Sequence, residues 1–165
     1  MIRNFPLITN GVALGLALAC GMLPSSAYAA NDKARISGLA DVAFGPVSTA
    51  TDTPISQDVC AYSSSATNGY SVTATGSGGG GAFTLSSGAA QLPYDVLWAD
   101  SAGQPNGTAL SAGTTTSGFI STAGQQGCSN PTASATLTVV IRAASLGTAL
   151  AGSYTGSLQI TIAPQ

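Results

Sequence analysis

Apolar and polar residues alternate in several short stretches of the chain. The clearest is the last, where Leu158, Ile160 and Ile162 fall on one side and Gln159 and Thr161 on the other. A period of two residues indicates a β-strand with one buried face, so we predict a strand over residues 154–162. An apolar strand left unpaired at a sheet edge is prone to aggregate. This strand therefore needs a pairing partner.

Six further strands are predicted upstream from similar patterns. Tyr94, Val96 and Trp98 share one strand face, and Leu137 and Val139 share another. Glycine, asparagine, serine and proline separate the stretches, which is typical of turns. The further strands are predicted over residues 38–44, 55–62, 69–75, 83–85, 93–100 and 135–142. Seven short strands at this spacing predict an all-β fold, specifically a β-sandwich.

The first residues have the pattern of an export signal. Arg3 precedes an apolar stretch, and the small-residue cleavage site AYA follows at residues 27–29. We predict a signal peptide over residues 1–29 and a single mature domain over residues 30–165. Two alternatives remain open, an uncleaved membrane anchor and a lipoprotein attached at Cys20. In each case the protein is expected to be exported.

Charged residues are few and of limited kinds. The chain has four lysines and arginines together, six acidic residues that are all aspartates, and no histidine. This composition gives no basic patch for nucleic acid and lacks the residues that most often transfer protons in catalysis. Asp95 and Asp100 are expected on opposite faces of a strand, which makes them poor joint metal ligands. We predict a non-enzymatic protein with no cofactor and no metal site.

Two cysteines follow the predicted signal peptide, Cys60 and Cys128. No CxxC motif and no histidine accompanies them, so a metal-binding or catalytic role is disfavoured. Exported proteins form disulfides in oxidising compartments. We predict one disulfide between Cys60 and Cys128, which would stabilise the domain by about 4 kcal/mol by restricting the unfolded chain.

Four stretches, taken in order, resemble the blocks of a known family. They are LADVAFGPVS, VCAYSSSATNGYSVTATGS, LPYDVLWADSAG and AGSYTGSLQITI. Their order and spacing resemble the spore coat protein U and Csu-type pilin family, the subunits of archaic chaperone-usher pili. The resemblance runs from Gly38 to the C-terminus.

The resemblance implies an immunoglobulin-like β-sandwich that is incomplete because it lacks its last strand. In such subunits a periplasmic chaperone inserts a strand into the open groove, and the N-terminal extension of a neighbouring pilin later replaces it, with an outer-membrane usher as assembly partner. This is β-strand addition, also called donor-strand complementation. In this sequence the donor-strand groove would be lined by Tyr154, Leu158, Ile160 and Ile162.

The N-terminal part departs from the family pattern. Pilins of this family often carry a cysteine ahead of the Phe-Gly block, whereas residues 30–42 of this chain contain none. Ile36, Gly38, Ala40 and Val42 alternate along this stretch. They fit two interpretations, a donor segment for another subunit or the first strand of the domain itself.

The sequence thus predicts a structural subunit of a surface fimbria in a Gram-negative bacterium, which passes through the periplasm to the cell surface. No nucleic acid or small-molecule substrate is expected as a partner. The alternative is a secreted or surface-anchored β-sandwich that binds a surface or a glycan as an adhesin. Such a module would need exposed aromatic residues, and Tyr62 is the main candidate.

Overall fold

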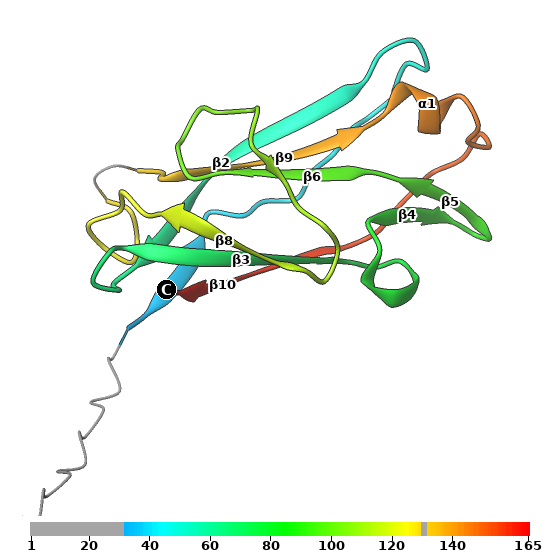
Figure 1. Cartoon of the computed structure of the whole chain (residues 1–165). Coiled ribbons are helices and arrows are strands. Elements are labelled where there is room, and N and C mark those ends of the chain that lie inside the picture. Colours follow the sequence, from blue (N-terminus) through cyan, green and yellow to red (C-terminus); the bar gives the residue numbers. More distant parts are fainter. Residues whose placement is uncertain (1–31, 130–131) are drawn as a thin grey trace, which may run out of the picture.

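The computed structural model describes residues 32–129 and 132–165. The predicted signal peptide and Cys20 lie outside these residues. Within them the chain forms ten strands, one 3₁₀ turn and one short helix (Figure 1). The strands are β1 (Ala34–Ser37), β2 (Thr53–Ser63), β3 (Gly69–Gly76), β4 (Thr84–Ser87), β5 (Ala90–Pro93), β6 (Asp95–Ala99), β7 (Thr108–Ala109), β8 (Thr115–Ile120), β9 (Ala135–Ile141) and β10 (Leu158–Pro164). The turn η1 (Gly79–Gly81) precedes β4, and the helix α1 (Ala143–Leu146) follows β9.

The strands form two antiparallel sheets and one hairpin. The larger sheet has the order β1-β2-β9-β6-β7, and the smaller has the order β10-β3-β8. β4 and β5 form a separate two-stranded hairpin that extends beyond one end of the two sheets (Figure 1). The two sheets pack face to face, so the predicted all-β sandwich is confirmed. Among the described residues, no helix has the length and apolar character needed to cross a membrane.

Large side chains from both sheets fill the centre of the sandwich. Trp98 of β6 and Tyr70 of β3 are fully buried, and the indole N–H of Trp98 donates a hydrogen bond of 3.1 Å to the hydroxyl of Tyr70. The two rings meet edge to face with centroids 6.5 Å apart, and the ring of Phe119 of β8 also packs against Tyr70, with centroids 5.7 Å apart. Burial raises the pKa of Tyr70 to about 12. The hydroxyl therefore stays neutral, and the buried indole N–H keeps its acceptor.

The predicted inward faces of the central strands are confirmed. Val96 and Trp98 of β6 and Leu137, Val139 and Ile141 of β9 all belong to the main hydrophobic core. β9 lies between β2 and β6, and its outward residues are buried as well. The buried hydroxyl groups on this outward face are hydrogen-bonded. Thr138 Oγ1 and Ser56 Oγ share a hydrogen bond of 2.8 Å, and Thr136 Oγ1 donates to the carboxylate of Asp58 at 2.7 Å.

The predicted strand over residues 38–44 is wrong. The first strand is β1, which pairs with the end of β2 in the register Ala34↔Ser63 to Ser37↔Cys60. Gly38 then takes a positive φ of 85°, a conformation that suits glycine and turns the chain away from the ladder. Ile36 therefore lies in the domain's own first strand, whereas Gly38, Ala40 and Val42 follow it outside any strand.

The last strand begins later than predicted. β10 starts at Leu158, and Tyr154 and Gly156 precede it. Thr155 forms an isolated bridge with Ser86 of β4, with both N–H···O bonds between 2.8 and 3.0 Å. A side chain at Gly156 would approach the carbonyl oxygen of Thr84 to 3.1 Å. This stretch therefore follows the β4–β5 hairpin instead of β3.

β5, β7 and β8 were not predicted from the sequence. β8 reads TTSGFI, which has no apolar alternation, and β7 has only two residues. The predicted strand over residues 93–100 is shorter in the structure, because Pro93 ends β5 and β6 begins at Asp95. Proline lacks the N–H that a continuous central strand would need.

The predicted disulfide between Cys60 and Cys128 is present, with Cα atoms 5.6 Å apart. Both cysteines are buried in a small second cluster with Ala123, and the half-buried ring of Tyr62 packs against it. The bond attaches the loop that precedes β9 to the end of β2. The ring of Tyr62 therefore packs within the domain and is only partly exposed for binding a surface or a glycan.

Candidate functional site

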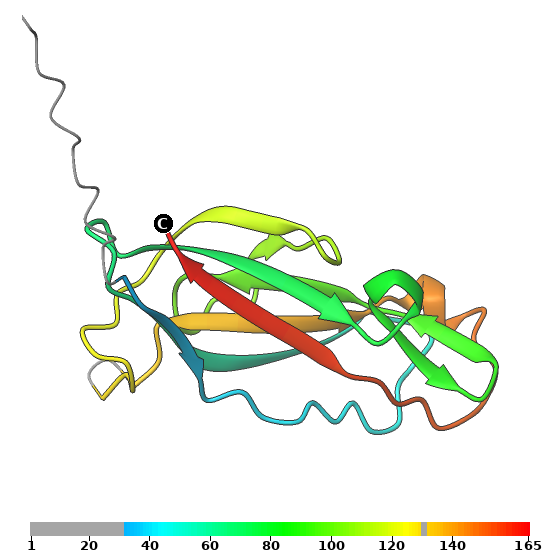
Figure 2. The same cartoon turned by 90° about the horizontal axis from the view of Figure 1, so that it is seen from below.

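An elongated apolar groove of about 1040 Å³ opens along one edge of the sandwich. Its floor is formed by core side chains of the larger sheet, together with Leu92 and Tyr94. One side is the chain leading into β10, and the other is the irregular segment between β1 and β2. Figure 2 shows these two sides, with β10 in red and the segment after β1 in cyan. The lining residues are 39–45, Val47, Gln57, Leu85, Leu92, Tyr94, Leu137, Val139, Ile141, 152–158 and Ile160.

β10 lies at the edge of its sheet and pairs only with β3. The N–H of Gln165 donates to the carbonyl of Gly69, which fixes the phase of the ladder. Hydrogen-bonded and non-hydrogen-bonded pairs alternate in an antiparallel ladder. The backbone N–H and C=O groups of Leu158, Ile160 and Ile162 therefore point away from β3, toward the open edge.

The side chains of these same three residues face the core and pack against it, yet they are only half buried. By contrast, Tyr70, Val72 and Ala74 of the neighbouring β3 are fully buried. Apolar side chains gain about 25 cal/mol per Å² when they leave water. The edge at β10 thus combines unpaired backbone groups with apolar surface that a further chain would cover.

The larger sheet is also unpaired along this edge. β1 pairs only with Cys60 to Ser63, so the residues of β2 from Thr53 to Val59 have β9 as their single neighbour. β1 itself lies beside the C-terminal half of β10 and closes that end of the sandwich (Figure 2). The opening therefore lies beside the N-terminal half of β10, next to Leu158 and Ile160.

The side of the groove that leads into β10 is attached to the β4–β5 hairpin. The Ser86–Thr155 bridge holds it, and Gly152 and Gly156 allow the close approach, since a side chain there would meet Ser87 at 2.7 Å or Ser77 at 2.8 Å. Tyr154 adds a hydrogen bond of 2.8 Å from its hydroxyl to the carbonyl of Leu150. The Gly-x-Tyr-x-Gly pattern of residues 152–156 therefore shapes this side of the groove.

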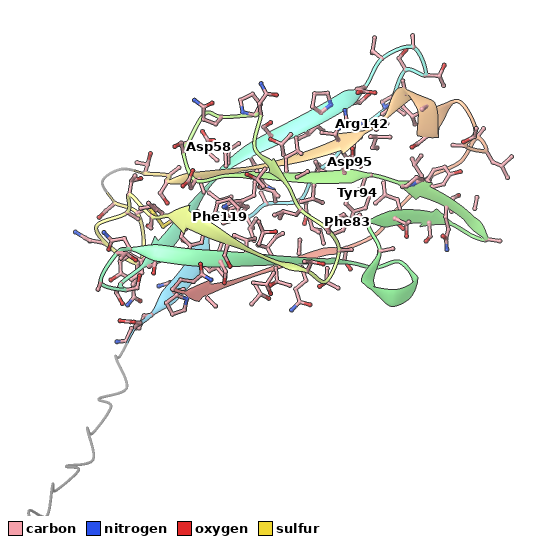
Figure 3. The ribbon with its side chains drawn as sticks, viewed as in Figure 1. Asp58, Phe83, Tyr94, Asp95, Phe119 and Arg142 are labelled. Carbon is pink, nitrogen blue, oxygen red and sulfur yellow. A yellow bond between two sulfur atoms is a disulfide. The ribbon has the colours of Figure 1, made fainter. Side chains whose placement is uncertain are left out.

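The aromatic residues at the hairpin end of the floor support one another. Phe83 and Tyr94 stack with centroids 5.7 Å apart, and both are labelled in Figure 3. Burial raises the pKa of Tyr94. Asp41 is the one charged residue among those that line the groove. The surface of the groove thus suits a neutral, apolar occupant.

The structure brings most of the predicted groove residues together. Tyr154, Leu158 and Ile160 line the groove. Ile162 lies further along β10, toward the end that β1 closes, and is not among the lining residues. Gln57, Leu92 and the residues 39–45 on the opposite side were not predicted to line the groove; among them, Ala40 and Val42 were assigned only to a donor segment or to a first strand. Only Gln57 carried a signal in the sequence, as a polar residue within the predicted strand over residues 55–62.

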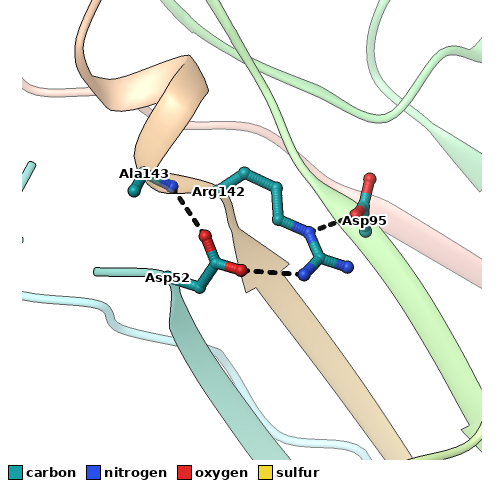
Figure 4. Close-up of polar contacts among 4 residues, drawn as sticks. All are labelled: Asp52, Asp95, Arg142 and Ala143. Carbon is teal, nitrogen blue, oxygen red and sulfur yellow. Dashed lines mark hydrogen bonds and ion pairs between the residues drawn. The ribbon is translucent and has the colours of Figure 1, made fainter. Parts of the chain in front are cut away.

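An exposed ion network links β6, the end of β9 and the residue before β2, next to Tyr94 and Ile141 of the groove floor (Figure 4). Arg142, next to Ile141 of β9, contacts Asp52 at 2.8 Å and Asp95 at 2.6 Å. The other oxygen of Asp52 accepts the N–H of Ala143 at the start of α1. The pKa of Asp52 is lowered mainly by that backbone hydrogen bond and, to a smaller extent, by the hydrogen bond from Arg142.

We expect acid to weaken the fold through Asp52. Its folded-state pKa is lowered, so its contribution is present above its unfolded pKa and is lost as the pH falls through the folded value, below about 4. Melting temperatures between pH 2.5 and 6 should decline less steeply for Asp52→Asn than for the wild type. Asp32→Asn, on an exposed residue near the N-terminus, is the control. Parallel curves for the wild type and Asp52→Asn would contradict this role.

A second carboxylate network ties a loop to the outward face of the larger sheet. Asp58, labelled in Figure 3, accepts bonds from the N–H of Gly103 at 2.8 Å and the hydroxyl of Thr136. Both hydrogen bonds lower the pKa of Asp58, and the bond from Gly103 has the larger effect. Asp100 accepts the N–H of Ile120 at 3.0 Å. Among the described residues, no group of three or more histidine, cysteine or acidic side chains is placed to hold a metal ion.

No protein-family model matches the chain, and no curated protein sequence matches it. Several solved structures match the chain in fold, including the following two. One is described as "Chaperone-tip adhesin complex is vital for synergistic activation of CFA/I fimbriae biogenesis". It has a TM-score of 0.51 and 20% sequence identity, over 82% of this chain and 42% of that chain.

The other is the CsuC-CsuE chaperone-tip adhesion subunit pre-assembly complex from archaic chaperone-usher Csu pili of Acinetobacter baumannii. Its TM-score is 0.42 and its identity 18%, over 79% of this chain and 39% of that chain. The chain thus spans about two fifths of the length of each chain that it matches. At this level of identity the likeness concerns the fold, and the immunoglobulin-like β-sandwich predicted from the sequence is confirmed by the first of the two.

Proposed function

We propose that this protein is a structural subunit of a surface fimbria that is assembled by the chaperone-usher route. Its groove would accept one strand from a periplasmic chaperone, and later a strand from a neighbouring subunit at an outer-membrane usher. The protein would pass through the periplasm to the cell surface of a Gram-negative bacterium. Its role is structural and non-enzymatic.

The observation that carries this proposal is the open edge of β10. Leu158 and Ile160 turn unpaired backbone groups toward the opening and half-buried apolar side chains toward the core. An extended segment placed there would satisfy the backbone groups and bury its own alternate side chains against Leu137 and Val139 on the floor. These are the two parts of recognition by β-strand addition, with backbone bonds for affinity and side-chain pockets for specificity.

The resemblance in sequence and the likeness in fold point the same way. Both structures with a similar fold are described as complexes of a chaperone with a tip adhesin or tip adhesion subunit. A chaperone as the first partner of this groove agrees with those descriptions. The Cys60–Cys128 disulfide also fits passage through an oxidising compartment.

We expect an added strand to stabilise the folded domain. An alternating segment, Thr-Val repeated four times, is fused after Gln165 through a glycine-serine linker of about ten residues, long enough to return along β10. Because this strand binds only the folded state, it should raise the free energy of unfolding by about 3 kcal/mol if its effective concentration exceeds its Kd a hundredfold. The measurement is urea denaturation of the fused and unfused proteins. The same residues in blocks, four threonines and then four valines, form the control.

Substitutions on the two faces of β10 test the same groove. Ile160→Asp places a charge at the half-buried face beside the groove, where it would stay unpaired under an added strand. It should abolish the gain from the fused strand. Thr161→Asp lies on the exposed face and should retain the gain. A freely soluble monomer that gains nothing from the alternating strand would rule out the proposed function.

A further inference from the structure

The two sides of the groove are held in different ways. The side leading into β10 is bridged to β4, whereas residues 39–47 on the other side, which we call the flap, form no strand or helix. Among the described residues, no backbone–backbone hydrogen bond involves the flap. The N–H of Ala40 donates to Oε1 of Gln57 at 2.9 Å, and Nε2 of Gln57 donates to the carbonyl of Ala40 at 3.3 Å. One side chain thus provides every hydrogen bond that attaches the flap to the sheets.

Gln57 is a polar exception on an inward-facing row. It pairs across the ladder with Leu137, and residues opposite each other in an antiparallel pair share a face of the sheet. Since Leu137 and Val59 belong to the main core, Gln57 also points inward, where it lines the groove. Its carboxamide reaches the edge of the groove, where Ala40, an exposed residue, supplies a partner for both its oxygen and its nitrogen. The carboxamide oxygen accepts from the N–H of Ala40, and the carboxamide nitrogen donates to its C=O. The side chain of Gln57 thus makes the two hydrogen bonds that the backbone of a neighbouring strand would otherwise make.

The flap has apolar surface left to bury. The side chain of Leu39 is 43% exposed at the groove, and Val42 and Phe44 are only half buried against the core. Moving the flap toward β10 would cover these residues together with the exposed part of the floor, which favours closure. Glycines at positive φ, Gly38 at 85° and Gly45 at 62°, lie close to its two ends and can accommodate such a rotation.

We propose that Gln57 is a positioning residue that holds the flap open, and that without it the flap closes onto the groove and competes with an incoming strand. This inference rests on the proposed function, because it assigns Gln57 a part in strand acceptance. The partner remains an extended, neutral segment with alternate apolar side chains. Gln57 determines how much of the groove is accessible to that segment.

The test removes the two hydrogen bonds while keeping the shape of the side chain. Gln57→Met is compared with Gln159→Met, the same substitution on the exposed face of β10. The probes are the free alternating peptide of four Thr-Val repeats and the dye 8-anilinonaphthalene-1-sulfonate, which binds exposed apolar surface. Amide exchange at Ala40 reports the bonds directly.

Gln57→Met should lose protection of the Ala40 amide, bind less dye, and bind the peptide about tenfold more weakly, as expected for the loss of two hydrogen bonds that oppose closure. Gln159→Met should match the wild type in all three. Unchanged or increased binding of dye and peptide by Gln57→Met would overturn the inference. If the wild type binds no peptide, the proposed function fails, and unchanged dye binding and Ala40 exchange would then count separately against the role of Gln57.

Discussion

Replacing Trp98 by alanine should lower the free energy of unfolding by about 3 to 5 kcal/mol, the range found when a large aromatic side chain is removed from a packed core. Trp98 is fully buried at the centre of the sandwich. Its removal would leave a cavity between the sheets and would deprive the hydroxyl of Tyr70 of its indole partner. Urea denaturation followed by circular dichroism measures the change.

Two further variants separate packing from hydrogen bonding. Trp98→Phe keeps one aromatic ring but loses the N–H together with part of the indole ring system, so it should be less destabilising than Trp98→Ala. Leu150→Ala changes an apolar side chain that is 71% exposed and should shift stability by at most about 0.5 kcal/mol. Equal losses for Trp98→Ala and Leu150→Ala would contradict the assigned core.

Removing the disulfide should cost the domain about 4 kcal/mol, because the bond closes a sequence separation of 68 residues and restricts the unfolded chain. The double variant Cys60→Ala with Cys128→Ala isolates this effect. Denaturation of the oxidised wild type and of the double variant gives the difference, and the reduced wild type serves as the control, since it keeps both sulfur atoms.

The reduced wild type should resemble the double variant if the covalent bond is the source of the stability. If the reduced protein were as stable as the oxidised one, the loop-closure argument would fail for this domain. If the double variant were much less stable than the reduced protein, packing of the sulfur atoms against Ala123 and Tyr62 would be the larger contribution.

Sequence reasoning succeeded best at the strands of the sandwich interior. β3 and β9 are correct to within one residue at each end, and the apolar row predicted for β9, Leu137 and Val139, lies in the core. These strands have neighbours on both sides, so their alternating side chains alone specify which face is buried. The disulfide was also predictable, because only two cysteines follow the predicted signal peptide.

The edges of the sandwich were harder to predict. Residues 38–44 alternate as a strand does, yet they form none, because a strand exists only where another backbone completes its hydrogen bonds. Tyr154 and Gly156 continue the pattern of β10 and still follow β4 instead. In both places the decisive interaction is with a residue distant in the chain, Gln57 or Ser86.

The sequence by itself determined the all-β class, the inward rows of the central strands and the pairing of Cys60 with Cys128, since these follow from local periodicity and from the two cysteines that follow the predicted signal peptide. Only the tertiary structure decided that β1 closes one half of the edge, that the flap leaves the other half open, and that Gln57 faces inward and hydrogen-bonds Ala40 of the flap. The physical reason is that an edge is defined by which backbone groups remain unpaired after the sheets have formed. That property belongs to the assembled sandwich, and no single stretch of the chain contains it.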